Sequence, residues 1–120
     1  MPTIDYYMTL NSPWSYLGSA KFADMAKKYG YSVDIKPSKF GVIFPQTGGL
    51  PLPKRAPARQ AYRLQELKRW REVRGLPINI QPKHFPSDET PGTRLVIAAK
   101  LAGKDAHLLA TELGDRKSVV

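Results

Sequence analysis

The sequence contains no cysteine among its 120 residues. A chain without thiols has no disulfide framework, and its own side chains cannot carry out thiol–disulfide redox chemistry. The sequence also lacks an apolar run long enough to cross a bilayer and a basic segment leading into an apolar one at its N-terminus. We therefore expect a cytoplasmic protein with no membrane partner.

The sequence has few acidic residues relative to basic ones, and its formal net charge is +9. Much of the excess lies between Lys54 and Arg74, where basic and apolar residues interleave with the spacing of an amphipathic helix that has a solvated face. No helix-turn-helix turn, zinc-ligand pattern or aromatic RNA-binding strand accompanies it, so we expect no nucleic acid partner. The two histidines, His84 and His107, lack partner ligands, and we expect no metal site.

The beginning of the chain predicts a βαβ unit. Thr3–Leu10 is a largely apolar run suited to a central strand, and Tyr31–Pro37 alternates apolar with polar residues. Between them, Ser12 or Asn11 caps a helix that has Pro13 at its first position and a glycine after its last turn. Such a unit implies two parallel strands.

Prolines and glycines are concentrated from Phe44 to Pro57, which predicts a long irregular loop and no helix. A loop of this kind is typically a lid or wall of a functional site, and a disordered linker is the alternative. The rest of the chain predicts, in order, a helix at Pro57–Arg74, an extended stretch at Leu76–Pro86, and helices at Pro91–Leu101 and Asp105–Leu113.

The sequence Asn-Ser-Pro-Trp-Ser-Tyr-Leu-Gly, residues 11–18, lies where the first strand passes into the first helix. The strand delivers the hydroxyl of Ser12 to the unpaired N–H groups and the positive end of the helix dipole, where an anion such as a thiolate is stabilised. Thiol–disulfide oxidoreductases carry Cys-x-x-Cys at such a corner, and here Ser12 and Ser15 occupy both cysteine positions. The pattern therefore predicts a site that activates the thiol of a cofactor.

Each of these residues also has a purely structural interpretation. Ser12 can serve only as a helix cap, which stabilises a helix by about 1 kcal/mol. Asn11 can be a turn residue, and Trp14 can belong to the core. Ser15 we interpret as structural. The residues alone leave capping and catalysis open for Ser12.

Three segments, taken in order, carry a family resemblance. They are Ser12–Gly18 after a strand containing Asp5-Tyr6-Tyr7, then Pro57–Tyr62 at the start of a helix, and Leu76–Phe85. Together they resemble the 2-hydroxychromene-2-carboxylate isomerases, which are glutathione-dependent relatives of the kappa-class glutathione transferases in the disulfide-oxidoreductase branch of the thioredoxin fold. The resemblance covers nearly all of residues 3–113.

The resemblance implies an α/β protein with a thioredoxin-like fold and a helical domain inserted after the second strand. Residues 1–44 would form the N-terminal βαβ part, and residues 45–114 the loop and an incomplete inserted helical domain. The remaining strands would lie beyond Leu113, so we expect the C-terminal part of the thioredoxin domain to be missing from this fragment and residues 115–120 to be a non-native tail. An exposed strand edge leaves oligomerisation open, and a homodimer is considered for the full-length protein.

The same resemblance implies glutathione as the cofactor, with Ser12 hydrogen-bonded to its sulfur. The implied isomerase interconverts 2-hydroxychromene-2-carboxylate, a small aromatic carboxylate, and trans-o-hydroxybenzylidenepyruvate in aromatic-compound degradation. Lys54 and Arg59 are candidates for pairing with a carboxylate of glutathione or substrate, and Asn11 and Trp14 for lining the substrate pocket. The alternatives are a kappa-type glutathione transferase acting on another electrophile, and a non-catalytic thioredoxin-like or nucleic-acid-binding module.

Overall fold

The computed structural model describes residues 2–83 and 85–119. Strands and helices alternate only at the beginning, and helices follow. The elements are β1 (Thr3–Met8), α1 (Pro13–Lys28), β2 (Ser32–Pro37), α2 (Phe40–Thr47), a one-turn 3₁₀ helix η1 (Leu52–Lys54), α3 (Pro57–Arg74), α4 (Thr90–Leu101) and α5 (Ala106–Val119).

The predicted βαβ unit is confirmed. β1 and β2 pair in parallel, with Ile4 opposite Val33 and Tyr6 opposite Ile35, and they form a two-stranded sheet within the described part of the chain. α1 connects them. It begins at Pro13, whose fixed φ is helical, and the chain turns after it at Gly30, which has the left-handed φ of 75°.

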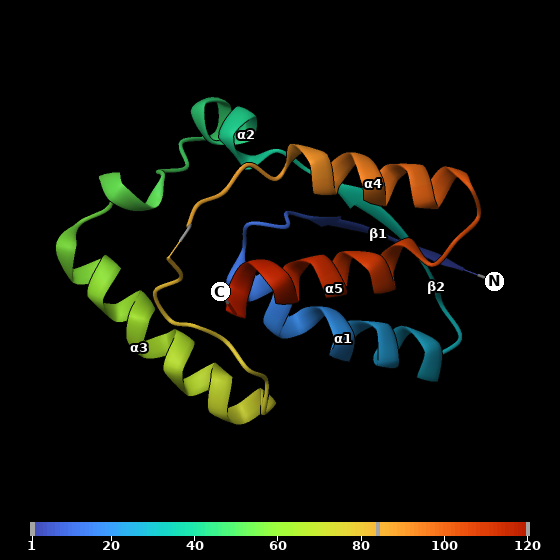
Figure 1. Cartoon of the computed structure of the whole chain (residues 1–120), viewed down its shortest axis with the longest axis horizontal. Coiled ribbons are helices and arrows are strands. Elements are labelled where there is room, and N and C mark those ends of the chain that lie inside the picture. The colour runs from blue at the N-terminus through green and yellow to red at the C-terminus, as the bar shows by residue number, and fades with distance from the viewer. Residues whose placement is uncertain (1, 84, 120) are drawn as a thin grey trace.

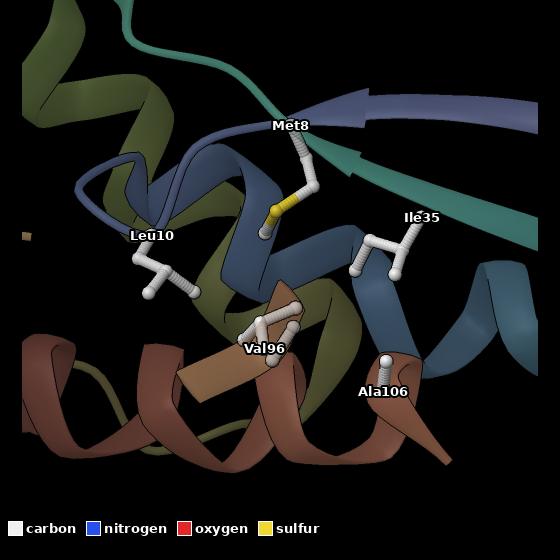
Figure 2. Packing of buried hydrophobic residues seen from close by; sticks show 6 residues of the cluster. Met8, Leu10, Ile35, Val96 and Ala106 are labelled. Atoms are coloured by element: carbon white, nitrogen blue, oxygen red, sulfur yellow. The ribbon is translucent and has the colours of Figure 1, made fainter. Parts of the chain in front are cut away.

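The main core lies between the strands and the two C-terminal helices. Figure 1 shows α1, α4 and α5 close to the strands, with α3 set to one side. In Figure 2, Met8 of β1 and Ile35 of β2 point toward Val96 of α4 and Ala106 of α5. Val96 is fully buried and Leu10, directly before the motif, is 2% exposed. Burial of such side chains contributes about 1.5–3 kcal/mol each, so this cluster fixes where β1 ends and the motif begins.

A second cluster joins α3 to α1. Leu67 of α3 and Ile78 of the following extended segment pack against Tyr16 and Leu17 of α1. The expected extended stretch is confirmed, since the described residues between 76 and 86 form neither helix nor strand. In Figure 1 this stretch runs back from the end of α3 to α4. The cluster therefore brings one face of α3 toward the N-terminal turn of α1.

The prediction that the segment from Phe44 onward excludes a helix is wrong in part. α2 extends from Phe40 to Thr47 and contains Pro45. A proline within a helix removes one backbone hydrogen bond and crowds the preceding turn, but its fixed φ is itself helical. The cost is limited here because the helix ends two residues later, at Thr47, and Gly48 caps it with φ of 78°.

The prediction that the last helix stops at Gly114 is also wrong. α5 runs through this glycine to Val119. Glycine in a helix costs about 1 kcal/mol relative to alanine, which a packed helix tolerates. Gly114 is buried and lies against Tyr16 of α1, where an added Cβ would stand 3.6 Å from the Tyr16 Cβ. The non-native origin expected for residues 115–120 stays a prediction.

Candidate functional site

The candidate site begins at the corner between β1 and α1. Ser12 is the N-cap of α1, with extended backbone angles, and its Oγ accepts a hydrogen bond of 3.2 Å from the backbone N of Ser15. The capping prediction is therefore confirmed. Capping uses the hydroxyl as an acceptor, and no described residue accepts its proton. The same oxygen can thus cap α1 and donate its proton to an anion at the helix N-terminus, so the two interpretations of Ser12 are compatible.

The corner is held by residues from the start of α4. The carboxylate of Glu89 accepts hydrogen bonds from the Thr9 hydroxyl and, at 3.2 Å, from the backbone N of Asn11. Gly92, in the first turn of α4, lies directly against Leu10. These contacts fix the backbone just before Ser12 from a segment far away in the sequence.

Asn11 has a defined side-chain orientation. Its Nδ2 donates to the carbonyl oxygen of Ser87 at 2.9 Å, and a flipped amide would set two oxygens against each other. Its Oδ1 is buried and has no hydrogen-bond partner in the described part of the chain. A buried acceptor without a donor is costly, so Asn11 Oδ1 is a candidate acceptor for a ligand N–H or O–H. The sequence allowed either a turn role or a place in the substrate pocket for Asn11, and its contact with a ligand stays a prediction.

A cavity of about 280 Å³ opens in front of this corner. It brings together the three predicted residues Asn11, Ser12 and Trp14. The indole of Trp14 is 40% exposed rather than part of the core. The rest of the lining comes from the corner between β1 and α1, from α2, from η1 and the residue after it, from α3 and from the segment before α4: Thr9, Pro13, Phe40, Gly41, Phe44, Leu52, Arg55, Arg63, Phe85 and Glu89. The proline- and glycine-rich segment thus contributes a wall of this cavity, and its role in a functional site stays a prediction.

The other two predicted residues, Lys54 and Arg59, do not line this cavity. Both side chains are exposed. Each is close in sequence to an arginine that does line it: Lys54 precedes Arg55, and Arg59 lies one helical turn before Arg63 on the same face of α3. Contacts of Lys54 and Arg59 with a carboxylate stay a prediction.

Sequence reasoning missed Arg55 and Arg63. The guanidinium of Arg63 lies over the ring of Phe85, 5.4 Å from its centroid, and Arg55 Nε donates to the carbonyl oxygen of Leu50 at 2.9 Å. Burial, and secondly the charge of Arg55, hold the pKa of Arg63 below its usual range. One available signal was the helical spacing, because Arg63 precedes the buried Leu67 by four residues and shares its inward face.

The corner, with its parallel strands and N-capped helix, agrees with a comparison against protein families. Residues 3–113 match the DSBA-like thioredoxin domain. The chain belongs to the DSBA-like thioredoxin domain family. The thioredoxin-like α/β fold class predicted from the sequence is thereby confirmed.

One solved structure with a similar fold is that of selenomethionine 2-hydroxychromene-2-carboxylate isomerase (HCCA isomerase). The TM-score is 0.54 and the identity 17%, and the match covers 96% of this chain and 76% of that one. At this identity the likeness concerns the fold. A comparison with curated proteins gave no match. No helix in the described part of this DSBA-like domain has the length and apolar character needed to span a membrane.

The DSBA-like domain presents a consistent set of groups to its cavity. A hydroxyl with a proton to donate stands at a helix N-terminus, an amide acceptor lies beside it, and two guanidinium groups and several aromatic rings form the walls. Because the chain has no cysteine, any thiolate at this corner must come from a ligand. Such a set favours binding of a partly apolar anion.

Proposed function

We propose that this protein is a glutathione-dependent isomerase that interconverts 2-hydroxychromene-2-carboxylate and trans-o-hydroxybenzylidenepyruvate in aromatic-compound degradation. The main support is the position of Ser12: in a chain without cysteine, a serine stands at the corner of a DSBA-like domain and faces a cavity with aromatic and cationic walls. The similar fold of HCCA isomerase adds support.

The residues at the corner fit the chemistry of glutathione. Ser12 would donate its hydroxyl proton to the sulfur, since its oxygen already accepts from Ser15 N. The hydroxyl and the positive end of α1 both favour a thiolate over a thiol. The unpartnered Oδ1 of Asn11 matches an N–H group of a peptide ligand. Lys54 and Arg59 are proposed to contact its carboxylates.

Opening of the hemiketal ring breaks its C–O bond and releases a phenol and a conjugated ketone. When bound, glutathione would supply a thiolate that adds reversibly to this conjugated system, which permits rotation about the resulting single bond before elimination returns the thiolate. The chain's own residues orient the two molecules and hold charge. Ser12 would stabilise the anionic sulfur before it bonds to the substrate and after elimination. The rings of Trp14 and Phe85 are proposed to line the aromatic part of the substrate.

The test is turnover of 2-hydroxychromene-2-carboxylate by the purified protein with and without glutathione, together with retention on immobilised glutathione. We expect retention, and turnover that depends on glutathione and is lost in Ser12→Ala. Retention without isomerisation, combined with conjugation of glutathione to 1-chloro-2,4-dinitrobenzene, would identify a kappa-type transferase instead. A folded protein that glutathione-agarose does not retain would refute both activities.

A further inference from the structure

The cavity beside Ser12 holds two arginines without an acidic partner. Neither Arg55 nor Arg63 forms an ion pair with any described residue. Both are half-buried, and the charge of Arg55 contributes to the lowered pKa of Arg63. Two like charges at one partly desolvated surface are unfavourable until an anion joins them. This wall is therefore suited to an anionic ligand.

The single carboxylate in the lining, that of Glu89, does not neutralise this pair. Its Oε2 accepts from the Thr9 hydroxyl and from Asn11 N, and it makes no ion pair with either arginine. Glu89 is committed to the backbone of the corner. With two arginines and one glutamate, the charged groups of the lining retain a net positive charge.

The apolar part of the lining indicates that the rest of the ligand is aromatic. Phe85 lies under the guanidinium of Arg63, and Phe40 and Phe44 pack with ring centroids 5.6 Å apart. Trp14 lines the same cavity and is partly exposed. A flat aromatic molecule fits these rings, and its carboxylate fits the planar fork of an arginine that is itself held on an aromatic face.

We propose that Arg63, assisted by Arg55, binds the carboxylate of the aromatic substrate and makes the cavity select anionic over neutral aromatic molecules. This assignment rests on the proposed function of the same cavity, and it gives the two arginines, rather than Lys54 and Arg59, the carboxylate of the substrate. Arg63 is placed here as a specificity-determining residue, with Ser12 acting on the sulfur.

The test uses two probes of nearly equal shape, coumarin-3-carboxylate and the neutral coumarin-3-carboxamide, titrated calorimetrically without glutathione. We expect the native protein to prefer the carboxylate, and Arg63→Gln to reduce carboxylate affinity by about 10-fold or more while carboxamide affinity changes little. Arg55→Gln should reduce the same preference to a smaller extent. Lys68→Gln, which removes one charge from the exposed face of the same helix, is the matched control and should keep the preference.

Equal affinity of the native protein for both probes would overturn the assignment, as would an unchanged preference in Arg63→Gln. Should Arg63→Gln fail to fold, as judged by circular dichroism, the preference in Arg55→Gln decides. Retention on immobilised glutathione, measured on the same proteins, tests the proposed function separately. If glutathione-agarose does not retain the native protein, but that protein prefers the carboxylate probe and Arg63→Gln removes the preference, glutathione chemistry is refuted and the carboxylate site is supported. If Arg63→Gln no longer binds immobilised glutathione but still prefers the carboxylate probe, Arg63 contacts glutathione and not the substrate. That result would overturn the inference.

Discussion

Replacing Ser12 by glycine and by alanine should separate the two roles of its hydroxyl. The capping bond to Ser15 N is the one hydrogen bond that the hydroxyl makes with described residues. Loss of an N-cap serine costs about 1 kcal/mol when alanine replaces it but only a few tenths when glycine does. Both variants remove the proton donor to the bound sulfur, a kind of interaction that contributes about 2.7–4 kcal/mol to catalysis. The two variants should thus differ in their free energy of unfolding but show the same loss of catalysis.

The measurements are urea unfolding and glutathione-dependent turnover. We expect Ser12→Gly to unfold within several tenths of a kcal/mol of the native protein and to turn over about 10²–10³-fold more slowly. Ser12→Ala should show the same loss of turnover with about 1 kcal/mol less stability. Ser12→Thr keeps both a cap and a hydroxyl and is the control. Native turnover in Ser12→Gly would refute the catalytic role of the hydroxyl. If turnover falls across the variants only in proportion to the free energy of unfolding, Ser12 acts only as a helix cap.

Three further predictions concern the surroundings of this corner. The thiol of bound glutathione should have a lower pKa than in solution, so thiolate absorbance should appear at lower pH in the complex, and superimposable titration curves would exclude the effect. Glu89→Ala should cost about 1–3 kcal/mol in urea unfolding because it leaves the Thr9 hydroxyl without its acceptor, whereas Glu89→Gln keeps an acceptor oxygen and should cost less; equal costs would contradict this. Burial, and then Asp115, raise the pKa of Tyr16 to about 12, so the unfolded chain ionises this group first as pH rises above 10. The unfolding free energy should then fall by about 2 kcal/mol between pH 10 and 12. Tyr16→Phe should remove that part of the decline, and a pH profile identical to that of the native protein would disprove the assignment.

The elements that were predicted correctly are those with local signals at both ends. α1 has Ser12 before it, Pro13 at its first position and a glycine after its last turn, and α3 runs from Pro57 to Arg74 as its spacing indicated. The prediction excluded α2 because prolines usually end helices. In a helix of eight residues that ends soon after Pro45, the loss of one hydrogen bond is small enough for the fold to tolerate.

The sequence predicted only those residues of the candidate site that are close to one another in the chain. Asn11, Ser12 and Trp14 share one corner, so the motif sufficed to group them. The choice of Arg63 over Arg59 depends on how α3 rests on α1 through Leu67 and Tyr16, and that packing involves residues far apart in sequence. Charge and spacing alone predict a basic helix, and they do not predict which of its arginines lines the cavity beside Ser12.

The hydrogen bonds around the corner act over two very different lengths of chain. The cap of α1 joins Ser12 to Ser15, whereas Asn11 is joined to Ser87 and Thr9 to Glu89, contacts that span 76 and 80 residues. Closing loops of that length carries an entropy cost that only the docking of the later helices offsets. During folding, α1 can form early, but the cavity exists only once α4 has docked. A ligand of this cavity should therefore slow amide hydrogen exchange in α4 as well as in α1, because its binding free energy stabilises the long-range closure and not one helix.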